Sequence, residues 1–201
     1  MTDTKNLAWH YTTAFHIQEI LESEVLRPTG IGIQPPEKPI LWFSINKFWE
    51  NTVIKAIADG ETNGFLSRDQ LMFLTQAFFR FGVPMKGLMF GTMLKQKARM
   101  PSMAWKNLLA GAKINKADPT EWCGTFDSIP LQRTVIEVMY DDMQWRPLMS
   151  DFDTEKASVI PKLLEELSIR QELSQKIANE IESGVSAPKL TNLVSPLRHK
   201  T

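Results

Sequence analysis

Four short stretches of the sequence carry side chains that could hold a polar ligand and act on it. His10-Tyr11-Thr12 offers an imidazole and hydroxyl groups as hydrogen-bond partners. Leu41-Trp42-Phe43-Ser44 and Trp49-Glu50-Asn51-Thr52 bring aromatic rings that could lie against a planar group. Glu121-Trp122 adds a carboxylate, which could stabilise a positive charge that develops during a reaction. These residue types fit a chemistry of positioning and charge stabilisation.

Several familiar catalytic centres have no support in the sequence. His10 and His16 are too far apart to share one helix face, and His199 lies near the end of the chain, so no zinc-like cluster is visible. Neither a glycine-rich phosphate loop nor a nucleophile elbow occurs. Cys123 is the single cysteine, which excludes an internal disulfide. Its thiol could act as a nucleophile beside a histidine, but a small buried thiol in a strand is the favoured interpretation.

The order of these stretches resembles the ADP-ribosyltransferase superfamily, especially the His-Tyr-Glu branch of diphtheria toxin and the poly(ADP-ribose) polymerases. The DNA-modifying ADP-ribosyltransferase toxins and the RNA 2′-phosphotransferases have a similar layout. The motifs themselves also look like those of a group of bacterial and phage proteins. The resemblance covers about residues 7–148. Besides the four stretches, it rests on Ile20-Leu21-Glu22-Ser23, Leu26-Arg27-Pro28 and Asp127-Ser128-Ile129-Pro130.

The resemblance implies that NAD is the substrate and assigns residues to hold it. His10 would bond the adenosine-side ribose, and the backbone at Tyr11 would hold the nicotinamide amide. Tyr11 stands where many polymerases have glycine, so its side chain must turn away. Thr12 would contact the ribose or the amide. The aromatic residue and the serine that end the second strand would be Phe43 and Ser44.

The resemblance also supplies a stacking ring and a catalytic carboxylate. Trp49 is the candidate for the ring that stacks on nicotinamide, although the family's usual tyrosine is absent. Glu121 would bond the nicotinamide-ribose 2′-hydroxyl and stabilise the oxocarbenium-like state as nicotinamide leaves. Asp127 and Glu137 compete for this role. Glu137 alternates with apolar neighbours within a strand, so we expect it to face solvent or to pair with Arg133.

Each candidate also has a purely structural role open to it. Polar side chains at strand ends often satisfy local hydrogen bonds, large aromatic rings usually pack in the core, and a serine often caps a helix. Glu50 could be an exposed or a capping carboxylate. These alternatives apply to His10, Thr12, Phe43, Ser44, Trp49 and Glu121.

Composition places the chain among ordinary globular proteins. It has 201 residues, 43% of them apolar, and its 23 Lys+Arg balance 23 Asp+Glu. The zero net charge removes the simplest case for a nucleic-acid binder, which is a strongly basic domain. No apolar run approaches the roughly 20 residues that a membrane span needs, and the first residues do not read as a signal peptide. With a single cysteine, we expect a cytoplasmic protein of a bacterium or of a phage-infected host.

The resemblance implies an α+β fold of two split mixed or antiparallel sheets with flanking helices over residues 1–150. We expect strands at 7–12, 40–44, 122–126, 134–139 and 145–148, and helices at 17–25, 48–58 and 101–113. Residues 71–81 are compatible with either. An amphipathic helix at 154–183 and a loose tail would form a C-terminal extension over 151–201. The apolar stripe of this helix could pack on the domain itself, or contact a partner or a second copy.

The resemblance predicts ADP-ribosyl transfer from NAD to a macromolecular target, protein or nucleic acid, by a toxin- or phage-type modifier. His10, Phe43-Ser44 and Glu121 should then line one cleft. One alternative is an enzyme like the 2′-phosphotransferases, for which Arg27 and Arg80 are the candidate phosphate contacts. Another is a non-catalytic interaction protein that retains the fold.

Overall fold

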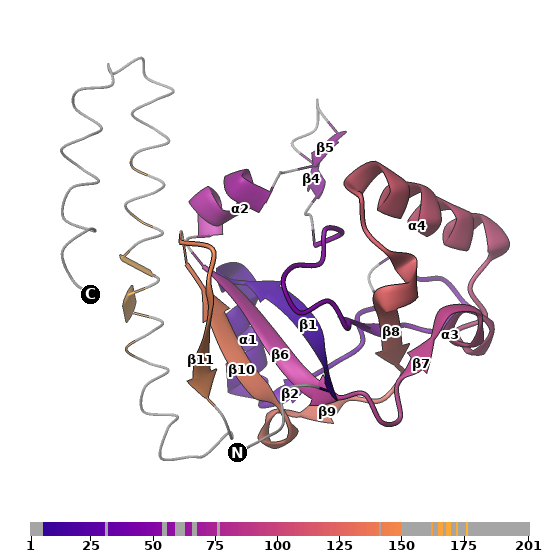
Figure 1. Ribbon diagram of the computed structural model, residues 1–201, viewed down its shortest axis with the longest axis horizontal. Helices are drawn as coiled ribbons and strands as arrows, with labels where there is room; N and C mark the ends of the chain where they lie inside the picture. Colours follow the sequence, from indigo (N-terminus) through magenta and orange to yellow (C-terminus); the bar gives the residue numbers. More distant parts are fainter. Residues whose placement is uncertain are drawn as a thin grey trace.

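In the computed structural model, the described residues are 6–30, 32–53, 56–58, 63–65, 68–75, 77–140 and 142–149, with seven separate positions between 162 and 176. They form a mixed α+β structure built on a mostly antiparallel sheet, as the sequence predicts at this coarse level (Figure 1). Seven strands follow one another across this sheet: β11 (Trp145–Met149), β10 (Val135–Met139), β6 (Phe78–Pro84), β1 (Leu7–Thr13), β3 (Leu41–Ser44), β8 (Trp122–Thr125) and β7 (Met89–Phe90).

The two sides of β1 are joined to the sheet very differently. Seven residue pairs connect β1 to β6, whereas one pair, Trp9 with Ser44, connects β1 to β3. The expected pair of split sheets is therefore wrong as stated, because the seven strands belong to one hydrogen-bonded sheet. That sheet nevertheless consists of two halves that meet at a single residue pair, since β1 and β3 diverge on either side of it.

Helices lie on both halves of the sheet. Helix α1 (Ala14–Ser23) packs against β1 and β6, and α3 (Gly91–Lys97) packs against β7 and β8. Helix α4 (Ser102–Asn115) lies above the β8 end of the sheet, and α2 (Arg68–Thr75) lies near the start of β6 (Figure 1). Two small ribbons, β2 (Val25–Leu26) with β9 (Ile129–Pro130) and β4 (Ala56–Ala58) with β5 (Asn63–Phe65), complete the regular structure together with the short helices η2 (Pro119–Glu121) and η3 (Leu131–Arg133).

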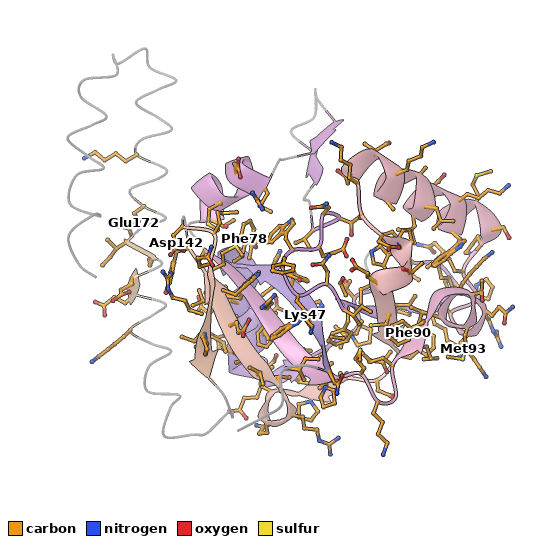
Figure 2. All side chains as sticks on the ribbon, viewed as in Figure 1. Lys47, Phe78, Phe90, Met93, Asp142 and Glu172 are labelled. Carbon is orange, nitrogen blue, oxygen red and sulfur yellow. The ribbon has the colours of Figure 1, made fainter. Side chains whose placement is uncertain are left out.

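The main core lies between α1 and the centre of the sheet. Phe79 and Phe81 on β6 are fully buried there with Ile17 of α1 and Leu41 of β3. A second apolar cluster packs around the start of β6, where Phe78 lies beneath α2 (Figure 2). Each large buried side chain stabilises the fold by roughly 1.5–3 kcal/mol, which fixes the strands that carry the candidate site residues.

Most predicted elements are present, with one clear exception. The predicted helix at 48–58 is wrong, because residues 48–53 form turns and residues 56–58 form β4. Asn46 Oδ1 accepts the backbone N–H groups of residues 48 and 49, and Glu50 Oε1 accepts the N–H of Thr52. These side chains occupy amides that could otherwise enter helical hydrogen bonds, so the segment turns instead.

Two further predictions concern ambiguous or largely undescribed segments. Residues 71–81 are helix first and strand afterwards, with α2 ending at Thr75 and β6 starting at Phe78. The predicted helix at 154–183 lies mostly outside the described residues, but the seven positions described within it are helical. The predicted tail from residue 185 lies outside them entirely, and so does any contact surface on the 154–183 stripe.

Candidate functional site

A cavity of about 910 Å³ opens where β1 and β3 diverge. This volume falls in the range of about 300–1,000 Å³ that is usual for small-molecule sites. One wall comes from the sheet, the opposite wall from α4, and the rest from loops. The sheet contributes Trp9, His10, Tyr11, Trp42, Phe43, Ser44 and Trp122; α4 contributes Ala104, Asn107, Leu108, Gly111, Ile114 and Asn115; the loops contribute Ile33, Glu37, Glu50, Thr52, Val53 and Met100.

The structure brings four of the seven predicted site residues into this lining and leaves three outside it: Thr12, Trp49 and Glu121. His10, Tyr11, Phe43 and Ser44 all border the cavity. Thr12 is buried and is not among the lining residues. Trp49, the predicted stacking ring, also lies outside the lining. Its ring packs instead on Phe78, at 4.8 Å between centroids, and parallel to Trp145 at 6.3 Å.

The His10 ring is held by the diverging strands. Its Nδ1 lies 2.9 Å from the Trp42 carbonyl oxygen. Because a carbonyl can only accept, Nδ1 carries the proton, and Nε2 is the acceptor nitrogen of the neutral ring. The ring also meets Phe43 edge to face, with centroids 5.8 Å apart. The contact across the β1–β3 gap therefore fixes both the tautomer and the orientation of the imidazole.

The Tyr11 side chain is held by contacts with Asn46 and Trp49. Its hydroxyl donates to the Asn46 carbonyl oxygen at 3.1 Å, and its ring packs against Trp49 at 5.7 Å between centroids. Burial raises the pKa of Tyr11 to about 12, while the Arg80 guanidinium opposes this rise and the carboxylates of Glu50 and Glu121 add to it. The phenol is therefore neutral near neutral pH, and two carboxylates lie close enough to affect it.

Glu121 stands at the start of β8, next to the cavity. It ends the short helix η2, whose N-terminus is capped by Asp118, and it is half-buried. Its Oε2 accepts a hydrogen bond from Asn46 Nδ2 at 2.9 Å. Glu121 is not itself a lining residue, but the next residue, Trp122, lines the cavity and pairs with Ser44. The carboxylate thus lies beside the strand ends that carry the other predicted residues.

Asn46 connects these residues, and the sequence analysis did not single it out. Its backbone N–H donates to Ser44 Oγ at 3.1 Å, its carbonyl accepts from Tyr11, and its side-chain amide donates to Glu121. Ser44 therefore caps a turn at Asn46 rather than a helix. An asparagine two residues beyond a strand end is a common turn former, and this was the available signal. Its bond to Glu121, 75 positions away, had none.

Glu50 is the second residue whose role the sequence missed. The exposed alternative is wrong, because Glu50 is only 5% exposed and lines the cavity. Its Oε1 accepts from the Thr52 backbone N–H at 3.1 Å and from Thr52 Oγ1 at 2.7 Å. The capping interpretation comes nearer, since the carboxylate holds a turn, but the turn is the one that borders the cavity.

Glu137, a competitor for the catalytic role, has a different function in the fold. The expectation that it faces solvent or pairs with Arg133 is wrong. Its Oε2 accepts from Arg80 Nε at 2.7 Å and also contacts Arg80 Nη2, and the two residues are direct partners on β10 and β6. Asp127, the other competitor, is exposed in the loop after β8. Neither carboxylate lines the cavity.

Arg80 does not suit the phosphate-binding role considered for it. Its side chain is 6% exposed and paired with Glu137, and Nη1 donates to the carbonyl of Lys47, a residue labelled in Figure 2. Its guanidinium also lies 3.9 Å from the centre of the Trp9 ring. Arg27, the other candidate, is exposed and is not among the lining residues.

Two simpler catalytic chemistries find no support within the described residues. Cys123 is fully buried, as expected for a packed thiol, and burial raises its pKa to about 12. A thiol in this state is a poor nucleophile because little thiolate forms near neutral pH. No group of three potential ligands there could hold a metal ion. In the same part of the chain, no helix combines the length and apolar character needed to cross a membrane.

Comparisons with known proteins assign this chain to no family, so only its structure describes it. The chain matches no protein-family model, and no curated protein or solved structure is significantly similar to it. What defines this protein is therefore an α+β fold around a mostly antiparallel sheet, with a cavity at the junction of two half-sheets.

Proposed function

We propose that this protein transfers ADP-ribose from NAD to a macromolecular target, as a toxin- or phage-type modifier. The observation that carries the proposal is the adjacency of β1, β3 and β8 in the sheet. Strands β1 and β3 carry His10 and Ser44, which line one cavity, and Glu121 directly precedes β8 and bonds to Asn46 beside that cavity. The resemblance assigns His10 to ribose binding and Glu121 to charge stabilisation, and it maps Ser44 to the serine that ends the second strand.

The reaction requires positioning more than a protein nucleophile. The bond between the nicotinamide nitrogen and the ribose C1′ breaks, and its electron pair leaves with nicotinamide. Positive charge develops on the ribose, where the Glu121 carboxylate would stabilise it. A nucleophilic oxygen or nitrogen of the target then bonds to C1′ and releases its proton to solvent. Neither a thiol nor a metal ion enters these steps.

The charges around the cavity favour one end of NAD. Among the described residues no lysine or arginine lines the cavity, whereas Glu37 and Glu50 do. A pyrophosphate would meet two carboxylates and no lysine or arginine there, but the nicotinamide ring of oxidised NAD is positively charged. We therefore assign the nicotinamide-ribose end of NAD to the cavity and the pyrophosphate to its mouth. The same absence of cations, with Arg80 paired to Glu137, argues against a 2′-phosphotransferase.

The proposal is tested by adding NAD to the full chain at increasing concentrations and measuring the Tm of thermal unfolding at each concentration. A ligand at a hundredfold excess over its Kd stabilises the folded state by about 2.7 kcal/mol, so we expect a clear rise in Tm. Nicotinamide release should accompany it. His10→Ala should weaken NAD binding, because the bond of the imidazole to ribose exists in the ground state. An unchanged Tm at millimolar NAD would favour the non-catalytic interaction protein.

A further inference from the structure

Glu50 carries a buried charge for which the described structure provides no counter-charge. The residue is 5% exposed, and one of its oxygens, Oε1, is held by the backbone and hydroxyl of Thr52. Neither an ion pair nor a hydrogen bond to Oε2 occurs among the described residues. Burial of a carboxylate without a cation is costly. A group that bears this cost at a cavity wall is well placed to bind something that enters the cavity.

The walls around Glu50 suit a flat cation. Five aromatic residues line the cavity, Trp9, Tyr11, Trp42, Phe43 and Trp122, and no lysine or arginine among the described residues does. The faces of such rings attract cations, and the attraction increases when water is excluded. A delocalised cation is also more weakly hydrated than an ammonium group, so it loses less on entry.

We infer that Glu50 makes this cavity a binding site for a planar organic cation. The inference rests on the proposed function for the two sources of such a cation: the pyridinium ring of NAD and the guanidinium of an acceptor arginine. Both present a delocalised positive charge to the aromatic walls. The pyridinium has no N–H group on its ring nitrogen and would meet Glu50 through charge, whereas a guanidinium would also donate hydrogen bonds to Oε2.

Calorimetric titration of the full chain with three small probes tests this assignment. The probes are 1-methylnicotinamide, which is a pyridinium cation; nicotinamide, its neutral counterpart; and methylguanidinium. The cation that occupies the site should bind about tenfold or more tightly than nicotinamide, as expected for a desolvated cation on aromatic rings. Tight binding of 1-methylnicotinamide identifies the nicotinamide end of NAD as the source, and tight binding of methylguanidinium identifies an acceptor arginine.

Glu50→Gln provides the matching variant, and Asp127→Asn provides its control. Glu50→Gln should abolish the preference for the cation and leave nicotinamide affinity within about twofold, because the amide conserves shape and removes charge. Asp127 is exposed and is not among the lining residues, so its variant should retain the preference. A thermal melt checks that each variant folds. If Glu50→Gln does not fold, the comparison of probes on the wild type still decides.

The inference is overturned if neither cation binds the wild type more tightly than nicotinamide, or if a folded Glu50→Gln retains the preference. The probes lack ribose and phosphate, so their binding is independent of NAD cleavage. A wild type that selects the cation but neither binds nor cleaves NAD contradicts the proposed function alone. A wild type that cleaves NAD without any preference for a cation contradicts only the role of Glu50.

Discussion

Glu137 and Glu121 are half-buried carboxylates on either side of the central strand β1, and they have different partners. On the β6–β10 side, Glu137 meets the guanidinium of Arg80. On the β3–β8 side, Glu121 meets the neutral amide of Asn46, and no ion pair to it occurs among the described residues. A neutralised charge has its structural partner already. A charge held only by an amide remains available to respond to a ligand.

The backbone shows the same contrast. Seven residue pairs join β1 to β6, and a single pair joins β1 to β3. The well-paired side contains the main aromatic core, whereas the poorly paired side opens into the cavity. The cavity at this weak junction is lined by residues of both strands, among them His10 of β1 and Ser44 of β3. Substitutions on the two sides should therefore affect different properties: stability on one side and chemistry on the other.

The largest expected effect on stability is that of Glu137→Gln. The substitution leaves the Arg80 guanidinium buried without a counter-charge, and loss of one partner from a buried ion pair typically costs about 3–5 kcal/mol. Urea unfolding measures the change. Asp127→Asn, on an exposed loop, should stay within about 0.5 kcal/mol of the wild type. A loss below about 1 kcal/mol in Glu137→Gln would contradict the structural role of the pair.

Asn46→Ala should mainly lower the rate of nicotinamide release. It removes the donor that holds Glu121 Oε2 and also the Oδ1 that accepts two backbone N–H groups. We expect nicotinamide release to fall about 10- to 100-fold with little change in KM, since a misplaced carboxylate loses transition-state contact.

Asn46→Asp separates the two roles of this positioning residue. An aspartate retains the Oδ1 acceptor and the turn but replaces the donor to Glu121 with a like charge. It should therefore keep the turn, lose some stability through repulsion between the two carboxylates, and lose activity as Asn46→Ala does. Equal kcat values in the wild type and Asn46→Asp would show that Asn46 serves the turn alone.

Ionisation of Tyr11 should lower the free energy of unfolding at alkaline pH, by less than the substitutions above change stability or activity. Its pKa is raised to about 12 in the folded protein, above the ordinary value of 10, so the phenol ionises first in the unfolded chain. The contribution of Tyr11 to the free energy of unfolding is complete below pH 10 and is lost as the pH rises towards 12. At pH 11 the loss should be roughly 1 kcal/mol relative to pH 8. Tyr11→Phe should lack this share of the decline in urea unfolding, and identical declines would contradict it.

The sequence predicted the elements of the site better than the contacts between them. Strands at 7–12, 40–44 and 122–126 follow from local alternation and apolar runs, and they carry His10, Phe43 and Ser44 to the cavity. The helix predicted at 48–58 has an apolar periodicity that side-chain hydrogen bonds from Asn46 and Glu50 override. Local patterns contain no information about such bonds.

The missed contacts join distant parts of the chain. Arg80 and Glu137 are 57 positions apart, and Asn46 and Glu121 are 75 apart. Strand order brings each pair together, and a single sequence does not specify that order. For this reason Glu137 read as a surface charge, although it is half of a buried ion pair.

Nicotinamide release from NAD by Glu121→Gln, measured beside the wild type and Glu137→Gln, tests the central claim most directly. Loss of a preorganised electrostatic partner should lower kcat about 10²- to 10³-fold, or about 3–4 kcal/mol in the barrier, with KM and Tm little changed. Glu137→Gln should lose stability but keep its activity per folded molecule. Wild-type release by Glu121→Gln, together with loss in folded Glu137→Gln, would contradict the assignment of Glu121 and reverse the roles of the two sides.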